Sequence, residues 1–348
     1  MQHEDGREIV GFSTNEAERM AGISGDEVLF IVDEASGVPE EIFETIEGNR
    51  AGGARIVMFS NPTKTVGAFY EAFHTKRQFW HCIHINSEES PNVGTGRVII
   101  PGLATAEWVA EKKLEWGEGS PLYDVRVAGN FPSQAENAVI SLALIEAAKD
   151  REIEAGTISL GVDVARYGDD ASVIQPVAGR VQLPSTTLRT MDGVEVAGKV
   201  IEWVRNYRQA MGYTAPIKVK VDVIGYGSSC YDHLKHSDEA ERLGIIALEV
   251  NVAESATSVS EDDGEGYSRL RDQLWFALRD WLKEGQLLED GVLEAELVAP
   301  TYSFDAQGRY KVASKDEIKK LLKRSPDHAD ALALAVYDPP SHTRSHTW

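Results

Sequence analysis

The chain has 348 residues, of which 42% are hydrophobic and 8% aromatic, as is typical of folded globular domains. Its net charge of −21 excludes a surface that binds nucleic acid broadly through basic side chains, but not a local basic track. No apolar run approaches the ~20 residues of a membrane span, the first residues do not resemble a signal peptide, and Cys82 and Cys230 are isolated. We therefore expect a cytoplasmic protein without disulfides or structural zinc, long enough for two domains of roughly 100–200 residues each.

The first half of the chain alternates apolar strands with helices. Residues 28–32 (VLFIV) and 55–59 (RIVMF) predict buried strands, and residues 39–47 predict a short helix between them. A further strand is expected at residues 80–85 and a helix at residues 105–116. Continuous apolar strands that alternate with helices are typical of a parallel sheet covered on both faces.

Polar side chains follow the first two strands, where sheets of this kind bind ligands. Asp33 and Glu34 come directly after the first strand, and Ser60, Asn61 and Thr63 follow the second. An apolar strand that ends in Asp-Glu matches a Walker B element, whose aspartate holds the magnesium ion of a bound nucleotide. The phosphate-binding pattern G-x-x-x-x-G-K-[ST] occurs nowhere in the sequence, so we do not expect this chain alone to bind ATP competently.

A turn-rich junction at residues 129–157 precedes a second sheet and contains a short helix at residues 141–148. The strands expected at residues 158–164 and 171–177 flank the turn-forming segment 166–170 (RYGDD), which predicts a β-hairpin.

Helices and further strands follow this hairpin. We expect a helix at residues 194–210, a strand that contains Asp222, and a helix that begins near Ser229. Residues 267–284 carry leucines four apart, which predicts a helix with a buried face, and residues 309–313 predict a strand. Two helices at the C-terminal end complete an order that predicts a mixed α/β sheet rather than a second doubly wound one.

Four aspartates stand out in this half. Asp163 (in ISLGVDVA) and Asp222 (in IKVKVDVIGYG) lie within apolar strands, where an unpaired charge is costly to bury. Asp327 and Asp330 lie three residues apart in SPDHADAL, on one face of a helix that we expect Ser325 to cap. Each aspartate alone is more readily explained as a strand end, a turn or a first-turn acid. Together, on two strands and one helix, they predict a metal site.

Such a site suits phosphodiester hydrolysis. Mg²⁺ prefers oxygen ligands and keeps several waters, so two or three carboxylates suffice to hold it. We predict that Asp163, Asp222 and Asp330 bind Mg²⁺ or Mn²⁺, and that Asp327 helps to place a second ion. Two ions roughly 3.5–4 Å apart activate a water molecule and stabilise the leaving oxygen. This chemistry is that of an endonuclease.

A basic stretch at residues 311–324 leads directly into SPDHADAL. It is either a solvated helix face or a contact with the DNA backbone, and its position beside the predicted metal site favours the latter. The candidate DNA contacts are Lys311, Lys315, Lys319, Lys320 and Arg324.

In combination, these motifs resemble the large subunit of a tailed-bacteriophage terminase, the motor and nuclease that packages viral DNA into a prohead. The resemblance runs through most of the chain, in the segments VLFIVDEASGVPEEIFE, MFSNPTKTVGAFYEAF, GVDVARYGDDASVI, VDVIGYGSSCYDHL, YSRLRDQLWFALRDWLKEG and YKVASKDEIKKLLKRSPDHADALALA. It implies that residues 157–340 form an RNase H-like mixed α/β nuclease domain with Asp163, Asp222 and Asp330 as metal ligands. It further implies that residues 1–135 are the C-terminal part of a P-loop (ASCE-type) ATPase domain, with a partial parallel sheet and a linker at residues 136–156.

The resemblance also implies partners and leaves alternatives. Double-stranded DNA is the implied substrate, and a terminase small subunit and the portal of a prohead are the implied partners. Ser60, Asn61 and Thr63 would sense the nucleotide, with ATP used only if an N-terminal part carrying the Walker A loop is supplied, in the same or a separate chain. The chain would then be a truncated terminase. One alternative is a non-catalytic or split-motor assembly component from a decayed prophage. Another is an unrelated RNase H-like resolvase or transposase, which would not need VDEA followed by SNPT.

Overall fold

The computed structural model describes residues 8–11, 23, 25, 27–49, 53–132, 137–165 and 171–339. The turn expected at residues 166–170 lies outside them. The chain divides into two compact units. The first comprises Met1–Ala106 and Asp124–Pro132, and the second comprises Glu107–Tyr123 and Ser133–Trp348. Within the described ranges, no helix has the length and apolar character needed to cross a membrane.

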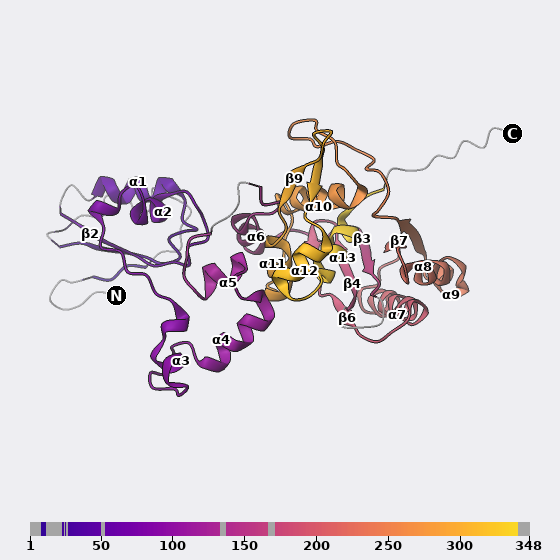
Figure 1. Cartoon of the computed structure of the whole chain (residues 1–348), viewed down its shortest axis with the longest axis horizontal. Helices are drawn as coiled ribbons and strands as arrows, with labels where there is room; N and C mark the ends of the chain where they lie inside the picture. The colour runs from indigo at the N-terminus through magenta and orange to yellow at the C-terminus, as the bar shows by residue number, and fades with distance from the viewer. Residues whose placement is uncertain are drawn as a thin grey trace. The chain divides into compact units, whose positions relative to one another are not determined.

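The first unit contains a two-stranded parallel sheet and several short helices (Figure 1). In chain order its elements are β1 (Leu29–Val32), α1 (Glu40–Asn49), β2 (Arg55–Met58), α2 (Ala68–Phe73), the 3-10 turns η3 (Arg77–Phe79) and η4 (Ser87–Glu89), and α3 (Pro91–Thr95). Helices α4 (Ala106–Lys112) and α5 (Pro121–Arg126) each cross a boundary between the units in the sequence, and the π-helical turn η5 (Lys113–Gly117) belongs to the second unit. The predicted parallel pair of strands and the helix between them are confirmed.

Two expectations for this unit are wrong. Residues 80–85 adopt no regular structure, because β-branched residues form a strand only where a partner strand supplies a ladder. The sheet is also not covered on both faces by the described residues. Phe30 packs against Ile42 and Ile46 of α1, whereas the alternate side chains Leu29 and Ile31 are 55% and 66% exposed.

The second unit is a mixed α/β structure, as predicted. Its main sheet has the strand order β5-β4-β3-β7-β8, with β6 also pairing with β4. Strand β3 is antiparallel to β4 and parallel to β7, which is parallel to β8. In chain order the elements are α6 (Leu142–Lys149), β3 (Ile158–Asp163), β4 (Ser172–Ala178), β5 (Val181–Gln182), β6 (Thr186–Leu188), α7 (Gly193–Met211), β7 (Ile217–Asp222), α8 (Gly227–His236), α9 (Asp238–Arg242), β8 (Ile245–Val250), α10 (Leu270–Leu282), α11 (Gly291–Val298), β9 (Tyr302–Phe304), β10 (Tyr310–Val312), α12 (Lys315–Leu322) and α13 (Asp327–Val336).

Strand alternation divides this sheet into a core face and a site face. On β3, Ile158, Leu160 and Val162 pack with apolar residues of α7 and α8, which lie side by side (Figure 1). The intervening side chains of β3, which end with Asp163, therefore face the other way. Helix α13 lies against that opposite face and contacts α10 and α11 behind it.

Gly161 lets α13 approach β3 very closely. A Cβ atom at this position would lie 2.0 Å from the Ala331 carbonyl oxygen and 2.4 Å from the Ala335 amide nitrogen. Only a residue without a side chain fits there, because real Cβ contacts are not shorter than about 3.0 Å. The backbones of the strand and the helix are consequently in direct contact.

Candidate active site

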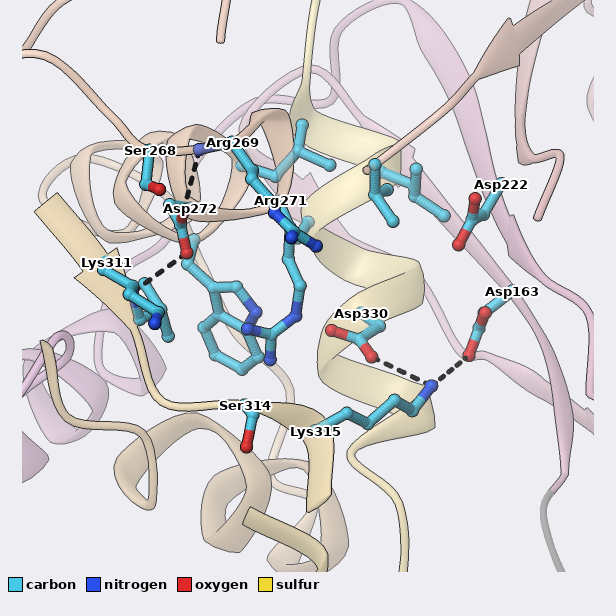
Figure 2. A pocket seen from close by; sticks show the side chains of 16 residues that line it. Asp163, Asp222, Ser268, Arg269, Arg271, Asp272, Lys311, Ser314, Lys315 and Asp330 are labelled. Atoms are coloured by element: carbon cyan, nitrogen blue, oxygen red, sulfur yellow. Dashed lines mark hydrogen bonds and ion pairs between the residues drawn. The ribbon is translucent and has the colours of Figure 1, made fainter. Parts of the chain in front are cut away.

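Three of the predicted ligands line one cavity of about 460 Å³, as Figure 2 shows. Val162 of β3 pairs with Val221 of β7, so that Asp163 and Asp222 follow at equivalent positions of two adjacent strands. Asp330 comes from the first turn of α13, which lies across the same face of the sheet. The strand, strand and helix origin expected from the sequence is therefore present, whereas the role of these residues as ligands stays a prediction.

The ammonium group of Lys315 lies among these carboxylates (Figure 2). Its Nζ atom is 3.4 Å from Asp163 Oδ2, 3.3 Å from Asp327 Oδ1 and 3.1 Å from Asp330 Oδ2. Lys315 is the first residue of α12, whose N-terminus is fixed by reciprocal bonds between Ser314 and Glu317. In this arrangement the lysine contacts acids, although the basic pattern of its segment suggested a DNA contact.

Burial dominates the titration of the acidic residues. It raises the pKa of Asp163 to about 8, helped by the neighbouring carboxylates and opposed by Lys315. It also raises the pKa of Asp222 to about 6 and that of Asp327 above its usual range. For Lys315, burial disfavours the charged form, but the carboxylates outweigh it and raise its pKa. The site therefore has more carboxylates than cations, and the ammonium of Lys315 neutralises only part of their negative charge.

The donor set suits a hard divalent cation, because every candidate ligand is a carboxylate. As the described side chains stand, however, no group of three or more acidic, histidine or cysteine residues is arranged to hold a metal ion. Lys315 supplies positive charge at the position where these carboxylates come together. A metal ion bound by these carboxylates would have to replace the ammonium group of Lys315.

Asp327 and the start of α13 are held in ways that the sequence did not reveal. Asp327 Oδ2 accepts a hydrogen bond from the Ala171 amide at 3.0 Å, which ties the helix to the beginning of β4. The cap expected from Ser325 is wrong, because Pro326 is the N-cap residue and provides no side-chain hydrogen bond. Ser325 precedes the capping position and is itself buried.

Glu296 of α11 caps this helix instead. Its Oε2 atom accepts hydrogen bonds from the amides of His328 at 2.9 Å and Ala329 at 3.0 Å. Its Oε1 atom lies 3.3 Å from both His328 Nδ1 and Arg324 Nε. The side chain is fully buried. Glutamate within the apolar run VLEAELV was the available signal, of the same kind as the strand aspartates.

The basic candidates have different environments. Arg324, which follows α12, donates from Nη2 to the Val292 carbonyl at 3.1 Å and from Nη1 to the Glu115 carbonyl, so that it connects α11 and η5. Lys311 is exposed and lines the large cavity. Lys320 is exposed on α12, and Lys319 lines a smaller neighbouring cavity of about 260 Å³. Arg269 and Arg271, which line the large cavity, were not singled out from the sequence.

The ATPase candidates of the first unit follow β1 and β2. Ser60 Oγ accepts a hydrogen bond from the Ser36 amide at 3.0 Å, and Thr63 Oγ1 donates to Ser36 Oγ at 3.1 Å. Ser36, which was not predicted, thus links the two loops that end the parallel strands. The remaining candidates are exposed, namely Asp33, Glu34 and Asn61.

The sequence is similar to that of a terminase large subunit. No protein-family model matches the chain. A curated relative, the probable terminase large subunit of Enterobacteria phage P7, is 28% identical over 340 residues, which cover 92% of this chain. The match spans 65% of the length of that relative. The resemblance predicted from the motifs is thereby confirmed.

Solved terminase nuclease domains are also similar to the chain. The nuclease domain of the large terminase subunit gp2 of bacterial virus Sf6 is 21% identical, with a TM-score of 0.42, and covers 58% of this chain and 100% of its own. The large terminase nuclease from thermophilic phage G20c with bound magnesium is 17% identical, with a TM-score of 0.40, and covers 58% of this chain and 98% of its own. At these TM-scores the likeness is too loose to establish a fold.

Proposed function

We propose that this chain acts as the nuclease part of a terminase large subunit, a metal-dependent endonuclease that cuts double-stranded viral DNA for packaging. The observation that carries the proposal is the convergence of Asp163, Asp222 and Asp330 on one cavity. Carboxylates from two adjacent strands and a helix across the sheet are an arrangement that structural stability alone does not require, because burying them together is unfavourable. Sequence similarity to a terminase large subunit then supplies DNA as the substrate.

The second unit fits an RNase H-like fold under this proposal. Its sheet combines an antiparallel part, β3 with β4 and its short neighbours, with the parallel strands β7 and β8. The domain limits proposed from the sequence, residues 157–340 for the nuclease and residues 136–156 for a linker, are part of the same proposal. Helix α6 falls within that linker and contacts α10 and α11.

Asp163, Asp222 and Asp330 would hold two Mg²⁺ or Mn²⁺ ions, with Asp327 beside the second. When bound, these ions supply an activated water molecule and stabilisation of the leaving oxygen. In their absence, Lys315 keeps the carboxylates together by neutralising part of their charge. Its side chain is 41% exposed, so the ammonium can move towards solvent or towards a phosphate oxygen when the acids are otherwise neutralised.

The first unit would serve a packaging motor. We propose that residues 1–135 correspond to the C-terminal part of an ATPase domain, in which Asp33, Glu34 and the linked hydroxyls of Ser60 and Thr63 act at the nucleotide. Translocation driven by ATP would require a phosphate-binding loop, a pattern that this sequence lacks. The small subunit and the portal would be further partners by the same resemblance.

A split motor is a second candidate for the first unit. The exposed apolar side chains Leu29 and Ile31 lie on the face of the two-stranded sheet that the described residues leave uncovered, and apolar surface of this kind favours an additional layer. Co-expression with a Walker A-bearing fragment should then yield a complex with ATPase activity. Fragments that neither associate nor hydrolyse ATP would exclude this candidate.

Nicking of supercoiled plasmid DNA in the presence of Mn²⁺ tests the proposed nuclease. We expect the full chain to nick the plasmid, and Asp163→Asn to be inactive while it remains folded by circular dichroism. Asp232→Asn, a matched change at an exposed position of α8, should cut like the unmodified chain. A folded chain that does not nick DNA, or an Asp163→Asn variant that does, would refute the proposal.

A further inference from the structure

The cavity that contains the acidic residues has a second, cationic end. Arg269, Arg271 and Lys311 line it together with the carboxylates, and Figure 2 shows them on the side away from Asp163 and Asp222. Arg269 and Lys311 are exposed, and neither forms a salt bridge with a carboxylate in the described part of the chain. One end of the cavity thus suits a cation and the other an anion.

The acid at the cationic end is engaged by the backbone. Asp272 Oδ1 accepts a hydrogen bond from the Val312 amide at 2.9 Å, and its Oδ2 accepts one from the Arg269 amide at 2.9 Å. The side chain is buried, and these bonds tie the start of α10 to β10. Asp272 therefore holds the wall of the cavity together.

Two buried donors of this wall have no acceptor among the described residues. Arg271 donates from Nη1 to the Ala313 carbonyl at 2.9 Å, but its Nη2 atom is buried without a partner. Trp275 is 1% exposed, and its Nε1 atom also lacks an acceptor. Buried donors without acceptors are unfavourable and uncommon in folded proteins. A ligand oxygen bound against this wall would supply a missing acceptor.

We propose that this cationic end binds a phosphate of the DNA strand that is cut at the carboxylates. The inference rests on the proposed nuclease function and adds the residues that position the strand. A phosphodiester strand is favoured over a small anion because one continuous cavity would take a metal-bound phosphate at one end and a second phosphate at the other. Apolar residues line the cavity as well, among them Leu274 and Val252, and they suit the sugar between the phosphates.

The salt dependence of DNA binding tests this proposal without any cleavage. Binding of a short labelled duplex by the full chain is measured by fluorescence anisotropy in EDTA over a range of KCl concentrations. Lys311→Ala and Arg269→Ala should each reduce the magnitude of the negative slope of log K against log [salt] by about 1, because each removes a phosphate contact. Lys199→Ala, which removes an exposed lysine of α7 paired with Glu202, is the matched control and should leave the slope unchanged.

A substitution of an uncharged residue separates the contribution of a hydrogen-bond donor from that of charge. Trp275→Phe keeps the aromatic packing but removes the N–H group, so we expect binding weakened about tenfold or more at an unchanged salt slope. Slopes like that of the unmodified chain for both Lys311→Ala and Arg269→Ala, or an equal loss for Lys199→Ala, would overturn the proposal. Plasmid nicking by the full chain together with unaltered slopes in both variants would support the nuclease and refute this phosphate site. Slopes of smaller magnitude in the variants, without plasmid nicking by the full chain, would support the phosphate site and refute the nuclease.

Discussion

Replacement of Glu296 is expected to destabilise the start of the helix that carries Asp327 and Asp330. The buried carboxylate accepts two amide hydrogen bonds of α13 and also lies 3.3 Å from Arg324 Nε and His328 Nδ1. Hydrogen bonds to a charged group contribute about 1.5–3 kcal/mol each, and removing one partner of a buried ion pair costs about 3–5 kcal/mol. These contributions overlap, so we expect Glu296→Ala to lower the free energy of unfolding by about 3–5 kcal/mol.

Glu296→Gln should cost less, about 1–2 kcal/mol, because its amide oxygen still accepts from the helix N-terminus while the charge is lost. The assay is urea unfolding of the full chain, combined with hydrogen exchange of peptides that cover residues 325–336. We expect faster exchange in this segment for both variants. The matched control is Glu195→Gln, because Glu195 accepts a hydrogen bond from the Asp192 amide at the exposed start of α7 and should matter by less than about 1 kcal/mol.

A change in the free energy of unfolding near zero would refute the capping role of Glu296. If Glu296→Ala changes the free energy of unfolding by less than the Glu195→Gln control, Glu296 does not cap α13. Normal protection of residues 325–336 in a destabilised variant would likewise show that the loss arises elsewhere.

Three further predictions concern the acidic site. Asp222→Asn should reduce Mn²⁺-dependent plasmid nicking at least ~100-fold, because a ligand is lost. It should also raise the melting temperature near pH 7, because a buried charge is lost. Nicking near the normal rate would contradict the role of Asp222 as a ligand. The raised pKa of Asp222, about 6, means that the metal-free folded state binds more protons than the unfolded chain above about pH 4. Stability should therefore fall as the pH rises from about 4 to 6, and the pKa of Asp163, about 8, extends this fall to about pH 8. Mn²⁺ affinity measured by calorimetry should rise over about pH 5–8, and a pH-independent affinity would exclude proton competition at these two residues. Lys315→Ala should lower the melting temperature without metal and increase the stabilisation by Mn²⁺, which differential scanning calorimetry measures; an unchanged metal-free melting temperature would show that the lysine does not balance the acids.

Local sequence patterns were sufficient to place the acidic side chains on their elements. Asp163 and Asp222 each end a run in which alternate residues are apolar, so their strands were predictable and so was their common face. The helix of Asp330 was predictable from its apolar spacing. The adjacency of β3 and β7 was inferred from chemistry, since no local pattern specifies which strands pair.

Contacts between distant segments could not be predicted. Glu296 lies more than two dozen residues before the helix that it caps, and the N-cap preference pointed to the nearer Ser325. The basic composition around Lys315 indicated a nucleic-acid contact, because sequence shows charge but not the acids that tertiary structure brings beside it. Strand β8 was missed for a similar reason, since its half-exposed pattern becomes a strand only through pairing with β7.

The contact at Gly161 implies that the spacing between Asp163 and Asp330 is set by main chain against main chain. Because no side chain separates β3 from α13 at this point, substitutions in the apolar core on the other face can accumulate without changing the separation of the two acids. Position 161 itself has no such latitude, since even a methyl group would push the helix outward together with its carboxylate. The separation of the two acids is therefore insensitive to substitutions elsewhere in the domain, but it requires that residue 161 has no side chain.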